Sequence, residues 1–134
     1  MREYLSWFYK GLAYNPEAIT QEDIYEFVKQ YSAPCAMRAG FEYYRAFPID
    51  AEQNKKIINQ SKLQMPVLVL ARDIYPVFGG DLAGNPILDS IRSLGVNVSG
   101  TVVPLSGHWI PEERPKFVVD QLFRFFGTGT NSIN

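Results

Sequence analysis

Two short strand patterns in the second half of the chain constrain its fold most. Residues 67–71 form the continuous apolar run VLVLA, and residues 98–103, VSGTVV, end in a β-branched run. A short, continuous apolar run is typical of a strand that is buried on both faces, as in a parallel sheet. Between the runs lies a helical pattern that ends at Gly95, and an amphipathic helix is expected from about Pro115. The pattern predicts a βαβα unit with parallel strands.

Two strands are too few for an independent parallel sheet. Such sheets are stable only when several strands lie side by side and both faces are covered. One edge of residues 67–71 or of residues 98–103 would be left open, with apolar flanks. We therefore expect this α/β chain to form the carboxyl-terminal part of a larger domain.

The first half of the chain has helical periodicity. Thr20 and Asp23 form an approximate capping box for a helix that reaches Tyr31. Pro48 should end a further helix, and Asp50 should cap a polar one over 51–62. We predict three regions: helices over 1–62, the α/β part over 63–127 and a disordered tail over 128–134.

Composition excludes several classes of partner and site. The chain of 134 residues has a net charge of −1, which predicts neither nucleic-acid nor membrane-surface binding. Cys35 is its only cysteine, so no internal disulfide or cysteine-based zinc site is expected, and no phosphate-cradling glycine motif suggests a cofactor. The amino terminus lacks the apolar core of a signal peptide, which favours a cytoplasmic protein.

The loop after the second strand pattern contains the only histidine, His108. Chemistry in open α/β sheets gathers at the carboxyl ends of strands, so His108 is a candidate catalytic base. The alternative is a structural histidine that packs beside Trp109.

Aromatic residues are dense in two helical segments. Tyr43 and Tyr44 point about 100° apart on a helix, so at most one of them belongs fully to the core and the other is free to face a cleft. Four crowded apolar positions lie near the amino terminus: Tyr4, Leu5, Trp7 and Phe8. They are expected to be ordinary core, with a partner-binding surface as the alternative.

The order of several motifs resembles one family. LQMPVLVLA, then a loop and a helix, then VVPLSGHWIPEERP and a closing amphipathic helix resemble the end of an α/β-hydrolase. Together with FEYYRAFPIDAEQN, they resemble the epoxide hydrolase and haloacetate dehalogenase branch, including its helical cap. The resemblance extends from about Glu3 to Phe126. It implies a cap over 1–62 and the last part of the hydrolase core over 63–127.

The resemblance implies roles for particular residues. His108 matches the general base that activates water to hydrolyse an aspartyl ester. Tyr44 matches the cap tyrosine that protonates an epoxide oxygen or binds a departing halide. Trp7 falls near a second ring donor of the cap, and both Trp7 and Trp109 are expected to contact a small-molecule substrate. Ser6 stands where the dehalogenases usually have histidine, which favours the epoxide hydrolases.

The sequence departs from the family pattern in two places. No nucleophile elbow precedes Trp7, so we expect the 134 residues to be inactive by themselves. The acid of the triad is open: alignment places Tyr75 there, and Asp73 and Asp81 are nearby candidates that also suit turns. Two alternatives stay open beside the epoxide hydrolase. One is a haloacetate dehalogenase-like hydrolase, and the other is a non-catalytic module that forms homo-oligomers through an exposed sheet edge.

Overall fold

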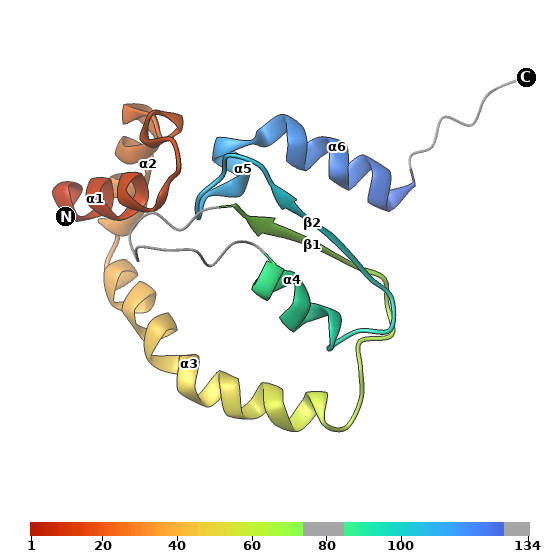
Figure 1. Cartoon of the computed structure of the whole chain (residues 1–134). Helices are drawn as coiled ribbons and strands as arrows, with labels where there is room; N and C mark the ends of the chain where they lie inside the picture. The colour runs from red at the N-terminus through yellow and green to blue at the C-terminus, as the bar shows by residue number, and fades with distance from the viewer. Residues whose placement is uncertain (74–84, 128–134) are drawn as a thin grey trace, which may run out of the picture.

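The structure is a computed structural model that describes residues 1–73 and 85–127 (Figure 1). The helical first part contains α1, α2 and α3, with a single 3₁₀ turn, η1, between the first two. The second part alternates strands and helices. In chain order the elements are α1 (Arg2–Leu12), η1 (Pro16–Ala18), α2 (Gln21–Tyr31), α3 (Ala36–Ile58), β1 (Val67–Arg72), α4 (Asn85–Arg92), β2 (Val98–Val103), α5 (Ile110–Glu113) and α6 (Pro115–Phe126).

β1 and β2 form a parallel pair, which confirms the predicted βαβα unit. Val67 lies opposite Val98, and the register continues to Arg72 opposite Val103. α4 packs against both strands, and α6 lies on the other side of them (Figure 1). Gly100 permits the approach of α4, because a Cβ atom there would overlap with the side chain of Leu88. Both strands point toward the end of the molecule where α1 and α5 lie (Figure 1).

A small core fixes α1 and η1 on α2. Thr20 and Asp23 form the predicted capping box, in which each side chain bonds the backbone N–H of the other residue. Ile19 and Ile24 are fully buried beside Ala13. Aromatic and aliphatic side chains from α1, α2 and the segment before α5 complete this cluster: Tyr9, Phe27, Val28 and Trp109.

The predicted break at Pro48 is wrong. α3 runs without interruption from Ala36 to Ile58, with Pro48 inside it, and Asp50 caps no separate helix. α3 has no buried residue, so water can replace the hydrogen bond that proline cannot donate. Ion pairs between residues one turn apart support the helix on both sides of Pro48: Glu42 with Arg45 and Glu52 with Lys55.

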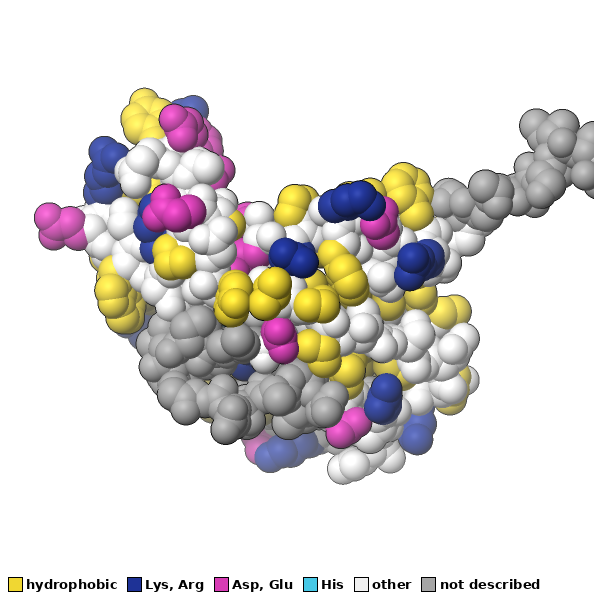
Figure 2. All heavy atoms as spheres, turned by 45° about the horizontal axis from the view of Figure 1, so that its top comes forward, with side chains coloured by type: hydrophobic (Ala, Val, Ile, Leu, Met, Phe, Trp, Pro, Cys, Tyr) yellow, Lys and Arg dark blue, Asp and Glu magenta, His cyan; other side chains and the backbone are white. Residues whose placement is uncertain are grey.

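The surface of α6 carries exposed apolar side chains. Figure 2 shows hydrophobic side chains gathered over the part of the molecule where α6 lies, interspersed with charged ones. Four of the exposed residues on α6 are large and apolar: Val119, Leu122, Phe123 and Phe126. Among the described helices, none combines the length and the apolar character that crossing a membrane requires. The predicted tail over 128–134 lies outside the described residues.

Candidate active site

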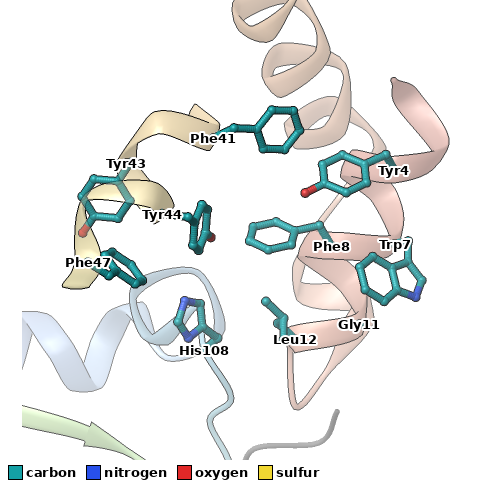
Figure 3. A pocket seen from close by; sticks show the side chains of 10 residues that line it. All are labelled: Tyr4, Trp7, Phe8, Gly11, Leu12, Phe41, Tyr43, Tyr44, Phe47 and His108. Atoms are coloured by element: carbon teal, nitrogen blue, oxygen red, sulfur yellow. The ribbon is translucent and has the colours of Figure 1, made fainter. Parts of the chain in front are cut away.

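A cavity of about 620 Å³ lies between α1, α3 and the loop that follows β2 (Figure 3). A neighbouring cavity of about 330 Å³ shares several of its walls, including Tyr44 and His108. Ten residues line the first cavity, and all but two are aromatic or histidine: Tyr4, Trp7, Phe8, Gly11, Leu12, Phe41, Tyr43, Tyr44, Phe47 and His108.

Helical spacing brings these rings to the cavity from two sides. On α1, Tyr4 stacks on Phe8 with ring centroids 6.1 Å apart, as residues four positions apart on a helix do. On α3, Tyr44 meets Phe47 at 5.3 Å, one turn further on. Tyr4 also meets the edge of Phe41 at 6.3 Å, and this contact joins the two walls. Phe8 and Phe47 were not among the site residues predicted from the sequence, although their spacing places them on the same helix faces as Tyr4 and Tyr44.

The loop after β2 delivers His108 to the cavity. Leu105 has a positive φ of 54°, and the buried hydroxyl of Ser106 donates to the carbonyl of Val103 at 2.7 Å, so the chain turns sharply at the strand end. The backbone N–H of His108 donates to the carbonyl of Leu12 at 2.9 Å. In Figure 3 the imidazole points into the space below Tyr44 and Phe47.

His108 has features of both predicted roles, the structural histidine beside Trp109 and the candidate catalytic base. Its ring meets Trp109 edge-on at 4.6 Å, yet the residue is exposed and lines the same cavity as Tyr44. Partial withdrawal from solvent lowers the pKa of His108, and the positive charge of Arg72 lowers it further, while Glu113 opposes the shift. A lowered pKa leaves the imidazole neutral at pH 7, which is the form that accepts a proton.

Gly107 lets the histidine loop touch the chain after α1. A Cβ atom at this position would overlap with backbone atoms of Leu12, Ala13 and Tyr14. Only glycine therefore allows this approach without a backbone shift. The loop and the end of α1 thus form one continuous wall of the cavity.

Of the three candidates for the triad acid, the structure describes Asp73 alone. Its carboxylate accepts a hydrogen bond from the N–H of Leu105 at 2.9 Å, and its own N–H donates to the carbonyl of Ser106 at 3.1 Å. Asp73 therefore stabilises the turn that precedes His108, a role that suits aspartate. Tyr75 and Asp81 lie outside the described residues.

The two tryptophans occupy different places. Trp7 borders the first cavity with 63% of its surface exposed, so the expectation that it is ordinary core is wrong. In Figure 3, Phe8 lies between Trp7 and His108. Trp109 borders the second cavity, and its ring is tilted against that of Tyr9 with the centroids 4.5 Å apart. Its indole N–H donates to the carbonyl of Tyr9 at 2.7 Å. Their contact with substrate stays a prediction.

The described residues offer no ready metal site. Over 1–73 and 85–127, no three histidine, cysteine, aspartate or glutamate side chains come together in a way that could hold a metal ion. The polar side chains among the residues that line the first cavity are phenols, an indole and an imidazole. These groups donate or accept hydrogen bonds, and the imidazole also exchanges a proton near neutral pH.

Comparison with known proteins finds likenesses to hydrolases. No protein-family model matches it. It is 33% identical over 126 residues to the soluble epoxide hydrolase of Corynebacterium sp. (strain C12). The aligned region covers 92% of this chain and 41% of that protein. The chain thus spans about two-fifths of the length of this curated relative.

Solved structures agree with this relationship. The Cfl2 protein of Burkholderia cenocepacia superposes with a TM-score of 0.80 at 33% identity, covering 93% of this chain and 40% of that one. The epoxide hydrolase CorEH superposes with a TM-score of 0.79 at 32% identity, covering 94% and 42%. A Nostoc protein assigned to the α/β-hydrolases gives 0.80 at 26% identity, covering 96% and 42%. These likenesses, at 26% to 33% identity, show that the chain has the fold of the carboxyl-terminal portion of an α/β-hydrolase.

Proposed function

We propose that the chain supplies the base and the proton donor of an epoxide hydrolase-like site. The observation that carries the proposal is that His108 and Tyr44 line one aromatic cavity from different elements (Figure 3). The named epoxide hydrolases among its relatives support the same reaction class.

Each group suits one step of the reaction. A carboxylate nucleophile attacks an epoxide carbon, the C–O bond breaks, and the Tyr44 hydroxyl donates its proton to the departing oxygen. The neutral imidazole of His108 then takes a proton from water as the water attacks the ester carbonyl. The ester hydrolyses to a diol and the free carboxylate. The imidazolium of His108 then returns a proton to the phenolate of Tyr44.

The walls of the cavity favour an uncharged substrate. None of its ten lining residues is lysine or arginine, and most are aromatic rings. Binding a haloacetate in such a cavity would bury its carboxylate without a cationic partner, which is costly. The cavity therefore supports an apolar epoxide over a haloacid.

The same ten residues include no aspartate or glutamate. We therefore propose that the 134-residue polypeptide binds an epoxide in this cavity without completing turnover. If the purified polypeptide formed diol, the proposal that it does not complete turnover would be overturned. Loss of that activity in His108→Gln would support the role of His108 as the base.

Ligand binding tests the proposal in the chain as it stands. His108 gives the only imidazole signals in an NMR spectrum, since the chain has one histidine. Styrene oxide or its diol should shift these signals in a saturable way, and chloroacetate at equal concentration should not. Tyr44→Phe should weaken the response to the epoxide, whereas Tyr25→Phe, at an exposed position on α2, should not. An equal response to chloroacetate, or none to either epoxide or diol, would contradict the proposed site.

The exposed apolar surface favours a second candidate function, self-association. β1 and β2 form only a two-stranded sheet in the described residues, and α6 exposes four large apolar side chains. Soluble monomers rarely expose contiguous apolar patches of large area. Sedimentation should then give a defined oligomer that Phe123→Ser weakens, and a monomer at every concentration would exclude this candidate.

A further inference from the structure

We propose that Glu113 is the positioning residue that holds His108 against α1. Its importance for catalysis rests on the proposed function, whereas the positioning itself does not. Glu113 was not among the site residues predicted from the sequence. Its carboxylate lies at the end of α5 and connects two segments of the chain that are far apart in sequence.

One oxygen of the carboxylate holds the histidine loop. Oε1 accepts hydrogen bonds from the N–H of Gly107 at 2.9 Å and from the N–H of Trp109 at 3.3 Å. These two residues flank His108 on either side. The carboxylate thereby fixes the backbone on both sides of the imidazole, and hydrogen bonds to a charged acceptor are stronger than neutral ones.

The other oxygen holds the segment that follows α1. Oε2 accepts hydrogen bonds from the N–H of Tyr14 at 2.7 Å and from the N–H of Asn15 at 3.0 Å. Four backbone donors from two segments therefore converge on one side chain. A carboxylate suits this arrangement because both of its oxygens only accept, whereas glutamine would turn one amide N–H₂ group toward two donors.

The bridge sets the relation between the base and one wall of the cavity. Leu12, which lines the cavity, accepts the backbone N–H of His108 at 2.9 Å, and Gly107 lies against the same segment. After loss of the bridge, the contacts that still hold the loop on α1 would include the hydrogen bonds His108–Leu12 and Trp109–Tyr9 and the ring contacts of Trp109 with Phe8 and Tyr9. A small displacement of a base is enough to lower catalysis strongly.

The charge of Glu113 also acts on the imidazole. It raises the pKa of His108, in opposition to Arg72 from β1 and to the partial removal from solvent. Arg114, Lys116 and Asp120 share a surface hollow with Glu113 and are the further charged groups nearby. Neutralising Glu113 should therefore lower the pKa of His108 further, a response that loss of packing alone would not produce.

NMR on the full chain tests the assignment without substrate. Glu113→Gln should move the amide signals of Tyr14, Asn15, Gly107 and Trp109 upfield together and should lower the pKa of His108. Glu113→Asp should restore part of both effects, since it keeps the charge on a shorter side chain. Glu112→Gln is the matched control, because Glu112 is the neighbouring exposed glutamate on α5 and should leave the four amides unchanged.

The outcomes separate this inference from the proposed function. Unchanged amide signals in Glu113→Gln, or an unchanged pKa of His108, would overturn the positioning role. If that variant unfolds, Glu113→Asp decides: the signals of the four amides should shift together relative to the unmodified chain, and unchanged signals or a shift of only some of them would overturn the role. Amide and imidazole responses as expected, with no binding of epoxide, would leave Glu113 as a positioning residue and remove the proposed function.

Discussion

The two walls of the cavity differ in how they are held. The α1 wall contains the buried residues Leu5 and Leu12, packs on α2 and is hydrogen bonded to the loop that carries His108. The α3 wall has no buried residue over its 23 positions, although it provides Tyr44. The candidate base is thus anchored, and the candidate proton donor stands on an exposed helix.

Because of this difference, substitutions in α3 and in the α1 wall should affect the stability of the fold to different extents. Substitutions on an exposed helix usually change the free energy of unfolding little, because few contacts are lost. Residues on α3 can therefore change the shape and polarity of the cavity at small cost to the fold. Changes on the α1 wall should affect both the fold and the placement of the candidate base His108.

The largest effect is expected in the core beneath α1. Ile24→Ala should lower the free energy of unfolding by about 2–5 kcal/mol, because Ile24 is fully buried and a cavity would remain. Ile57→Ala on α3 is the matched change at a residue with 59% exposure, and its effect should stay within about 0.5 kcal/mol. Urea denaturation of the two variants measures both. Equal losses would remove the distinction between the walls.

Matched glycine substitutions should give effects of opposite sign. Gly107→Ala should destabilise the protein by roughly 1–3 kcal/mol, because the new Cβ overlaps with the backbone of Leu12 and Tyr14. Gly40→Ala should stabilise it by about 0.5–1 kcal/mol, because a Cβ in α3 meets only Tyr31 at an ordinary 3.4 Å and alanine favours the helix. Thermal unfolding distinguishes them. Stabilisation by Gly107→Ala would show that the loop does not touch α1.

A smaller effect should appear only at alkaline pH. Burial and the neighbouring Tyr31 raise the pKa of Tyr9 to about 12, above the ordinary value of 10. The unfolded chain therefore releases this proton first, and the free energy of unfolding should fall as the pH rises from 10 to 12. Tyr9→Phe should reduce that slope. Denaturation curves at several pH values test this, and an unchanged slope would place the Tyr9 hydroxyl in solvent.

Local patterns in the sequence predicted the elements that depend on local chemistry. The capping box of Thr20 and Asp23, the apolar run before Arg72 and the β-branched run before Pro104 all lie where expected. Pro48 did not end its helix, because the outcome depended on exposure, which no local pattern states. Trp7 is exposed for the corresponding reason: apolar character alone does not say which residues of α1 face the core.

The site was only partly predictable. His108 and Tyr44 were assigned from their motifs, and the structure brings both to one cavity. Glu113 was not found, because its partners at Tyr14 and Asn15 are remote in sequence. An acidic residue shortly after the histidine was the available signal, but its four backbone donors appear only in three dimensions.

The hydrogen bonds of Glu113 also have a consequence for folding. They join positions separated by 99 residues, about three-quarters of the length of the 134-residue chain. Contacts across such a distance close a long loop, which costs entropy and slows folding. During synthesis, α1 and α2 leave the ribosome before α5. The α1 wall is therefore made before the loop that carries His108 is available to pack on it. Glu113 can hold the His108 loop against the segment after α1 only once the chain has been translated beyond Glu113.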